Sequence, residues 1–341
     1  MTPSFSLQPH LDQLHAKAAH TLAFRAQTLE EFAEWQHALR AKLKQLLGIE
    51  RRHHPSIIAK KLGAVDRGDY TEEKYQLDVD EGVSAPIYLL IPKGTPPPFK
   101  PLLVFHGHDP SAQYVLGNYP DTATAREQLA RENNYAQAFA RAGYLVCVVE
   151  QRGFGERLTH DTTSDSFPRS CRHLSFEYLL RGRTLLGERC WDGMCALDYL
   201  QTRSDLKQGA LGCTGHSGGG TTALWLTALD TRITVSVVAG YFSSFNESIL
   251  GMPHCECNYV PHILQWAEMG DIAALIAPRP LCLLNGELDP LFPIHAAREQ
   301  FETVKQAYSL HQASGSCSLS VHDGQHVYHH ALAREWFEKN Y

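Results

Sequence analysis

A serine lies at the centre of a short glycine-rich run whose spacing is typical of nucleophilic catalysis. Residues 211–220 read LGCTGHSGGG, so that Gly215 and Gly219 flank Ser217 in the pattern G-x-S-x-G. A serine hydroxyl attacks a carbonyl only when a neighbouring base accepts its proton. The pattern is meaningful where a strand precedes the serine and a helix follows it. It therefore requires a strand and a helix on either side of the serine, and a base and an acid elsewhere in the chain.

The residues on either side of Ser217 have the properties of a strand and a helix. Residues 209–215 read GALGCTG, and residues 220–229 read GTTALWLTAL. A serine at so sharp a turn takes a strained backbone conformation, and glycine neighbours relieve the crowding. The free N–H groups at a helix start let the amide of Gly218 bind a developing oxyanion. A plain glycine-rich turn is the alternative interpretation.

Two later strand ends supply an acid and a base. Asp289 follows the apolar run RPLCLLNG at residues 279–286, and His326 follows CSLSVHDG at residues 317–324. We expect His326 to act as general base and then as general acid, while Asp289 fixes its tautomer. The order serine, acid, histidine is that of α/β-hydrolases. Glu287 remains an alternative acid because it lies two residues from Asp289.

A second oxyanion donor is expected from the loop after the apolar run PLLVFHG at residues 101–107. We assign it to the amide of His108, because Gly107 lets the backbone approach a substrate closely. A metal held by His106 and His108 is the alternative. It is disfavoured because no carboxylate partner is evident beside them.

A second group of metal-ligand types occurs in HCECNY, which contains His254, Cys255 and Cys257. A zinc site usually shows C-x2-C spacing with a second pair elsewhere, and C-x-C lacks that support. Structural thiols are therefore favoured here. The sequence predicts no metal and no cofactor.

The order of elements along the chain predicts the fold. From residue 74 onward, short apolar strands alternate with helical patterns such as REQLARENNYAQAFARA and HAAREQFETVKQAY. Continuous apolar strands separated by helices indicate a mostly parallel central sheet covered by helices on both faces. We predict an α/β-hydrolase fold at 71–341, with lid or pocket insertions at 155–180 and 241–271.

Before this domain, a helical extension is expected at residues 1–70, packed on the core. Thr28 precedes Glu31 by three positions, as in a capping box, and apolar residues then recur at helical spacing to residue 46. The preceding LDQLHAKAAHTLAFRAQ is also expected to be helical.

The composition indicates a globular, cytoplasmic protein. Apolar residues make up 43% of the 341 residues, enough for a sizeable core. A formal net charge of -6 gives no basic surface for nucleic acid. No run of about 18 apolar residues is present, so no membrane partner is expected. Nine cysteines, an odd number, read as free thiols in a reducing compartment.

Several segments together resemble a known family, namely HGHD, GHSGGG, LIAPRPLCLLNGELDPLFP and DGQHVYHH. They are similar to the α/β-hydrolase superfamily, in its dienelactone-hydrolase-like and acetyl xylan esterase-like branch. The resemblance implies a serine carboxylesterase without a cofactor, with Ser217, Asp289 and His326 at the triad positions. It also places His108 where those esterases have an oxyanion-hole residue.

The function expected from this resemblance is hydrolysis of a small acyl ester, with acetyl as the expected acyl group, through an acyl-enzyme. A serine peptidase or a carbon–carbon bond hydrolase on the same triad is an alternative. A catalytically silent binding or scaffold protein is disfavoured because no triad member is missing. The expected partner is a small-molecule ester, and a homo-oligomer is left open.

Segments that follow strand ends are expected to supply the side chains that form the substrate pocket. The pocket candidates are Tyr241, Phe242, Phe245 and Trp266. Ion pairs that hold nearby loops are expected from Arg152, Glu156, Arg157 and Arg279.

Overall fold

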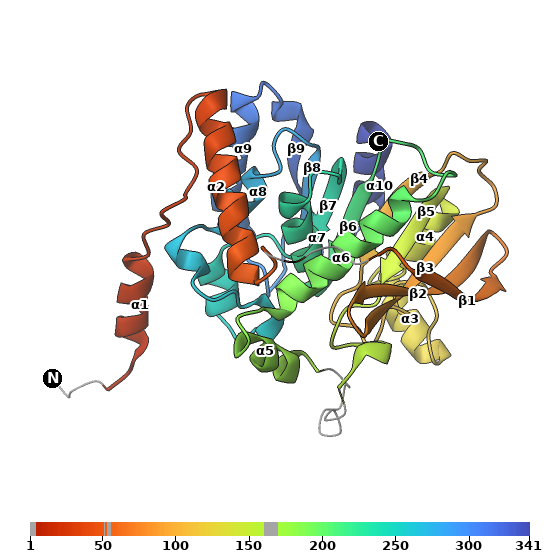
Figure 1. Ribbon diagram of the computed structural model, residues 1–341. Helices are drawn as coiled ribbons and strands as arrows, with labels where there is room; N and C mark the ends of the chain where they lie inside the picture. Colours follow the sequence, from red (N-terminus) through yellow and green to blue (C-terminus); the bar gives the residue numbers. More distant parts are fainter. Residues whose placement is uncertain (1–4, 51, 53–55, 160–169) are drawn as a thin grey trace.

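Nine strands form one sheet in the computed structural model, which describes residues 5–50, 52, 56–159 and 170–341 (Figure 1). The strands are β1 (Ala59–Asp66), β2 (Tyr70–Asp80), β3 (Val83–Pro92), β4 (Lys100–Phe105), β5 (Tyr144–Val149), β6 (Gly212–His216), β7 (Val235–Ala239), β8 (Leu281–Gly286) and β9 (Cys317–His322). Their order across the sheet is β1-β2-β3-β5-β4-β6-β7-β8-β9. Strands β1 to β3 pair antiparallel and β3 pairs antiparallel with β5, whereas the pairs from β5 to β9 are parallel.

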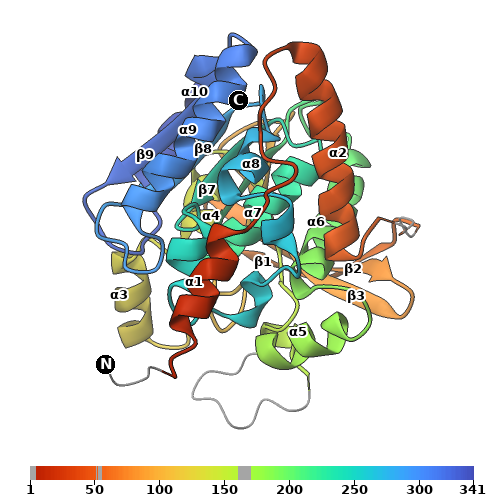
Figure 2. The same cartoon turned by 90° about the vertical axis from the view of Figure 1, so that its left-hand side faces the viewer.

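Helices cover both faces of this sheet (Figures 1 and 2). The α-helices are α1 (Gln8–Ala16), α2 (Leu29–Leu47), α3 (Thr122–Ala130), α4 (Tyr135–Arg141), α5 (Cys171–Leu179), α6 (Leu185–Gln201), α7 (Gly218–Leu229), α8 (Met269–Ala274), α9 (Ile294–Leu310) and α10 (His330–Asn340). One apolar cluster joins α2, α6, α7, α8 and α9 to the sheet, and a second joins α4 and α10 to its other face. The predicted α/β fold is therefore confirmed.

The register of the parallel strands brings their carboxyl ends to one edge of the sheet. Phe105 at the end of β4 pairs with Gly215 of β6, and His216 pairs with Ala239 at the end of β7. Gly286 of β8 likewise pairs with His322 of β9. In α/β sheets ligands bind outside this edge, where the loops converge. The loops after β4, β6, β8 and β9 all leave from it.

The N-terminal region differs from the predicted helical extension in two places. Helix α2 forms as predicted, with Thr28 and Glu31 in a reciprocal capping box. By contrast α1 ends at Ala16 and buries none of its residues, and Figure 1 shows it apart from the helices that cover the sheet. Strand β1 also lies before residue 71 and pairs along β2, so the sheet begins earlier than predicted.

The pattern REQLARENNYAQAFARA forms two helices instead of one. Helix α3 ends at Ala130, and α4 begins at Tyr135. Between them Glu132 takes a positive φ of 54°, which a continuous helix does not allow. The break matters because it places Arg131 and Asn133 beside the candidate site.

The two predicted insertions are only partly regular. Residues 160–169 of the first lie outside the described residues. The second contains a π-helical turn at Phe245–Leu250, short 3-10 turns at Glu256–Asn258 and Ile263–Gln265, and α8. Within the described ranges, none of the helices is both long and apolar enough to cross a membrane.

Replacing a buried leucine of α2 tests whether this helix is part of the hydrophobic core. Leu39 is fully buried, whereas Leu29 at the start of the same helix is 54% exposed. We expect Leu39→Ala to lower the free energy of unfolding by about 2–5 kcal/mol, because it removes packed methyl groups and leaves a cavity. Leu29→Ala, the matched control, should change it by less than about 0.5 kcal/mol. Urea unfolding of both variants measures the difference, and equal effects would contradict this packing.

Candidate active site

Ser217 occupies a strained turn between β6 and α7. Its φ is 57° and its ψ is -120°, and it is the residue directly before the helix. A Cβ on Gly219 would lie 2.0 Å from the carbonyl oxygen of Phe105, and one on Gly215 would lie 2.3 Å from that of Gly219. Only glycine fits at these two positions. The turn thus leaves Ser217 partly exposed among buried neighbours at the sheet edge.

Asp289 and His326 lie in direct contact. His326 Nδ1 is 2.7 Å from Asp289 Oδ2, and the other oxygen of Asp289 accepts hydrogen bonds from the amides of Leu291 and Phe292 at 2.8 and 3.2 Å. The carboxylate is thus held by three donors if Nδ1 carries the proton. His326 Nε2 is then the acceptor, and it has no hydrogen-bond partner among the described residues.

The other acid considered in the sequence lies elsewhere. Glu287 pairs with Arg298 of α9, with N–O distances of 2.6 and 3.2 Å, on the exposed surface. His322, at the end of β9, accepts a hydrogen bond through Nδ1 from the amide of Gly324 at 3.1 Å. The structure therefore brings Asp289, and not Glu287, to His326.

A buried histidine, His216, lies next to His326. The ring centroids of His216 and His326 are 4.6 Å apart, and His216 is buried at the end of β6. Burial, followed by the nearby His326, holds the pKa of His216 well below its usual range. His216 is consequently neutral and places no positive charge beside His326 at neutral pH.

The two predicted oxyanion residues border Ser217. Gly218 is the first residue of α7, where the N–H groups have no partner within the helix. The ring of His108 lies over it, since a Cβ on Gly218 would be 2.7 Å from His108 Cε1. The loop that carries His108 is tied down by Asn133, whose Nδ2 donates to Asp109 Oδ1 at 2.8 Å.

These groups surround one hollow of about 480 Å³. Its lining includes both predicted oxyanion residues and two of the predicted catalytic residues, Ser217 and His326, and the remainder is mainly polar. The lining residues are Gly107, His108, Asp109, Arg131, Asn133, His216, Ser217, Gly218, Pro253, His254, Cys255, Glu256, Asn258, Leu291, Phe292 and His326. Asp289 lies behind His326, 5% exposed.

The predicted aromatic pocket residues are not part of this lining. Tyr241, Phe242 and Phe245 are each 2% exposed or less and belong to the hydrophobic core. Trp266 packs on the N-terminal region, where the ammonium of Lys42 lies 4.0 Å from its ring. The structure thus places none of these four at the hollow, since aromatic residues after a strand can turn into the core as readily as toward a substrate.

Sequence reasoning also missed Arg131 and Asn133, which line the hollow. They lie in a stretch that reads as one helix, in which both look like solvent-facing residues. The Asn-Asn pair at residues 133 and 134 was the available sign of a break.

An ion-pair network beneath the site includes two of the predicted arginines. Arg152 donates to both oxygens of Asp192 at 2.9 and 2.7 Å and also contacts Glu188. Arg157 Nη1 is 2.5 Å from Asp192 Oδ2. The loop after β5 is thereby fixed to α6.

The other two charged residues have different partners. Glu156 pairs with Lys74 at 2.5 Å on the surface. Arg279 donates to the main-chain carbonyls of Thr227, Asp230 and Ile233 and thus binds the end of α7 instead of a carboxylate. Burial lowers the pKa of Arg279 to about 10.

The HCECNY segment divides between two environments. His254 lines the hollow, and its Nε2 lies 3.2 Å from Ser248 Oγ. The sulfur atoms of Cys255 and Cys257 lie 3.3 Å apart, and Cys257 Sγ lies 3.2 Å from His108 Nε2. Hydrogen bonds with Cys171 and Cys255, and the charge of Arg189, hold the pKa of Cys257 well below its usual range. All nine cysteines are free thiols.

Known proteins resemble this chain in sequence and in fold. The model described as "Abhydrolase family" matches residues 7–334. The protein named "Putative hydrolase YtaP" of Bacillus subtilis (strain 168) is 29% identical over 300 residues, which cover 86% of this chain and 95% of that protein.

Two solved structures share the fold at lower identity. A Bacteroides fragilis protein described as a "putative acetyl xylan esterase" superposes with a TM-score of 0.78 at 19% identity, covering 94% of this chain and 83% of its own. A glucuronoyl esterase from Solibacter usitatus gives a TM-score of 0.69 at 16% identity, covering 98% of this chain and 97% of its own.

Asp192 provides a test of the network beneath the site. Burial raises the pKa of Asp192, but the charges of Arg157 and Arg152 outweigh it and hold the pKa below its ordinary value. A carboxylate with a lowered pKa stabilises the fold above its unfolded pKa of about 3.9, and this contribution disappears as the pH falls. We expect Asp192→Asn to lower the free energy of unfolding by about 3–5 kcal/mol at neutral pH.

Urea unfolding across a pH series measures this effect, and the difference between wild type and variant should narrow below about pH 4. Asp66→Asn is the control, because Asp66 pairs with Lys93 on the surface. A pH-independent difference for Asp192→Asn would contradict the assignment.

Proposed function

The chain belongs to the Abhydrolase family, and from this premise we propose that it is a serine carboxylesterase with Ser217 as nucleophile. One observation carries the proposal. His326 is bound through Nδ1 to Asp289, its Nε2 has no partner within the described part of the chain, and it lines the same hollow as Ser217. A nucleophile, a base and an acid that orients the base are the minimum for such chemistry.

The proposed reaction begins when His326 Nε2 accepts the proton of Ser217 Oγ as the oxygen attacks the ester carbonyl. The amides of Gly218 and His108 bind the oxyanion that forms. Collapse of the tetrahedral intermediate breaks the bond to the alcohol, which leaves with the proton from His326. Water then attacks the acyl-serine by the same route and releases the acid.

Asp289 contributes by keeping a fixed negative charge. Two main-chain amides already hold one of its oxygens, so its other oxygen is positioned for His326 Nδ1. This arrangement stabilises the imidazolium that forms during the reaction. The neutral His216 beside the ring adds no opposing charge.

The lining of the hollow supports a small acyl group on a hydroxyl-rich alcohol. Asp109, Arg131, Asn133, His254 and Glu256 offer hydrogen-bonding groups, whereas a long acyl chain would need an apolar channel. The description of one similar structure as a putative acetyl xylan esterase supports this choice. An acetylated carbohydrate is the proposed substrate.

A second candidate substrate is an ester of a sugar acid. Arg131 favours it, because a guanidinium in the hollow can donate hydrogen bonds to the oxygens of the esterified carboxyl group and of the neighbouring hydroxyl groups. Comparing acetylated xylose with methyl glucuronate as substrates separates the two. Hydrolysis of aminoacyl arylamides instead of either ester would favour the peptidase alternative.

Hydrolysis of p-nitrophenyl esters tests the identity of the nucleophile and the preferred length of the acyl group. Wild-type protein should hydrolyse p-nitrophenyl acetate at least about tenfold faster, in kcat/KM, than the decanoate, because the polar hollow excludes a long chain. Ser217→Ala should lower kcat/KM on the acetate by about 10⁴-fold or more. Ser309→Ala, an exposed serine on α9, is the control and should match wild type. Activity retained by Ser217→Ala would exclude this mechanism.

Matched substitutions distinguish Asp289 from Glu287 as the carboxylate that orients His326. Asp289→Asn should lower kcat on p-nitrophenyl acetate by about 10⁴-fold, since the histidine loses its fixed tautomer and its counter-charge. Glu287→Gln is the matched control and should leave kcat within about twofold of wild type, because the Glu287 side chain pairs with Arg298 on the surface. The reverse ranking would assign the acid to Glu287.

A further inference from the structure

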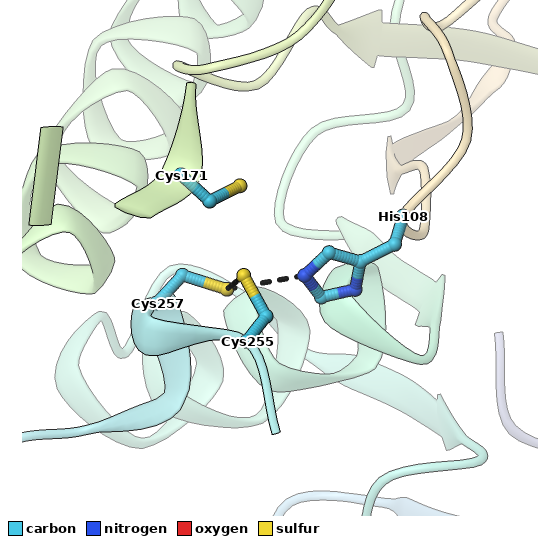
Figure 3. Close-up of side chains that lie close together, drawn as sticks. All are labelled: His108, Cys171, Cys255 and Cys257. Atoms are coloured by element: carbon cyan, nitrogen blue, oxygen red, sulfur yellow. Dashed lines mark hydrogen bonds between the residues drawn. The ribbon is translucent and has the colours of Figure 1, made fainter. Parts of the chain in front are cut away.

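Four metal-ligand side chains converge beside the hollow, from three separate segments (Figure 3). His108 follows β4, Cys171 begins α5, and Cys255 and Cys257 lie in the segment before α8. Their donor atoms all lie within 4.8 Å of one another. His108 Nε2 is 3.2 Å from Cys257 Sγ, which is 3.3 Å from Cys255 Sγ. In Figure 3 the four side chains point toward a common centre.

We propose that His108, Cys171, Cys255 and Cys257 bind one zinc ion in a tetrahedral Cys3His site. Zinc holds sulfur at about 2.3 Å and imidazole nitrogen at about 2.0–2.1 Å, so the donors of a tetrahedral site lie about 3.4–3.8 Å apart. The observed spacing spans this range, and small rotamer changes bring each donor to it. Thiolates together with imidazole are the donor set that selects zinc among common divalent ions.

A buried arginine next to the four side chains is a second, independent sign that this cluster carries negative charge. Arg189 is 2% exposed, and its Nη2 lies 3.2 Å from Cys171 Sγ. Its other hydrogen bonds go to the carbonyl of Arg152. Among the described residues no carboxylate forms an ion pair with it, although a buried guanidinium needs a counter-charge.

The charge of the proposed site matches that requirement. Three thiolates and one neutral imidazole around Zn²⁺ carry a net charge of −1, and Arg189 carries +1. The thiol protons leave to solvent when the ion binds. The ion thus lets three adjacent thiolates coexist where like charges would otherwise repel each other, and the arginine neutralises the remainder.

Burial indicates a structural site instead of a catalytic one. Cys171 and Cys257 are 1% and 3% exposed, and four protein ligands leave no position for water or substrate. The ion would tie the loop after β4 and the start of α5 to the segment at 241–271. Asn258, next to Cys257, also accepts a hydrogen bond from Thr221 of α7 at 2.9 Å, so the tie extends to the helix behind Ser217.

The sequence alone favoured structural thiols because C-x-C lacks a nearby second pair. The fold supplies the other two ligands from 147 and 84 residues before Cys255, as 255 − 108 and 255 − 171. His254, the histidine adjacent in sequence, lies on the hollow side near Ser248 and is not one of the four.

Metal content of the purified full chain tests the proposal, and its outcome does not depend on esterase activity. Protein expressed in zinc-supplemented medium and desalted should contain about one zinc per chain by inductively coupled plasma mass spectrometry. Cys255→Ser should lower the content at least about fivefold. Cys317→Ser is the matched control, because Cys317 is also a partly exposed thiol but lies outside the cluster, and it should retain the metal. Zinc below a tenth of an equivalent in wild type would overturn the proposal.

Cobalt substitution keeps the proposal falsifiable if Cys255→Ser folds poorly. Wild-type protein stripped with a chelator under reducing conditions and titrated with Co²⁺ should show the intense visible bands of tetrahedral cobalt and the sulfur-to-cobalt charge-transfer band, saturating at one equivalent. Added Zn²⁺ should bleach them. Absence of these bands, or a mass two protons lower that reveals a disulfide in the freshly purified protein, would contradict a metal site.

Discussion

The sharp turn at Ser217 is the constraint on which the arrangement of the site depends. A strand that passes directly into a helix at the edge of a parallel sheet brings its apex residue to a positive φ, and the turn is possible only because the neighbouring backbones touch. Gly215 lies against the carbonyl of Gly219, and Gly219 lies against that of Phe105 in β4. The contact with β4 fixes the loop that carries His108 relative to Ser217, so one packing constraint positions both.

The remaining groups of the site follow from the parallel sheet. Strands β8 and β9 end at the same edge, and their loops deliver Asp289 and His326 with an N–O distance of 2.7 Å. Loops of this kind need support from outside the sheet. The loops after β4 and β5 receive it from Asn133 on Asp109 and from the pairs of Arg152 and Arg157 with Asp192.

Much of the fold was predictable because its signals are local. Alternating apolar strands and helices, the capping box of α2 and the G-x-S-x-G run each depend on residues that are close in sequence. The acid could be narrowed only to Asp289 or Glu287, because a two-residue difference in a loop decides which carboxylate turns inward. Features that depend on contacts between residues far apart in the sequence were missed, because no local pattern announces them. Tyr241, Phe242 and Phe245 turn into the core. Arg131 and Asn133 emerge at a break in a helix, and Cys171 approaches Cys255 only through the tertiary fold.

Covalent labelling of the nucleophile tests the central claim most directly. The full chain would be treated with diethyl p-nitrophenyl phosphate, and intact-protein mass spectrometry followed by peptide mapping would locate the adduct. The account predicts a single diethylphosphoryl group on Ser217, formed quickly because His326 activates that hydroxyl and the two amides bind the phosphoryl oxygen. An unmodified Ser217, or an adduct on another residue, would contradict it.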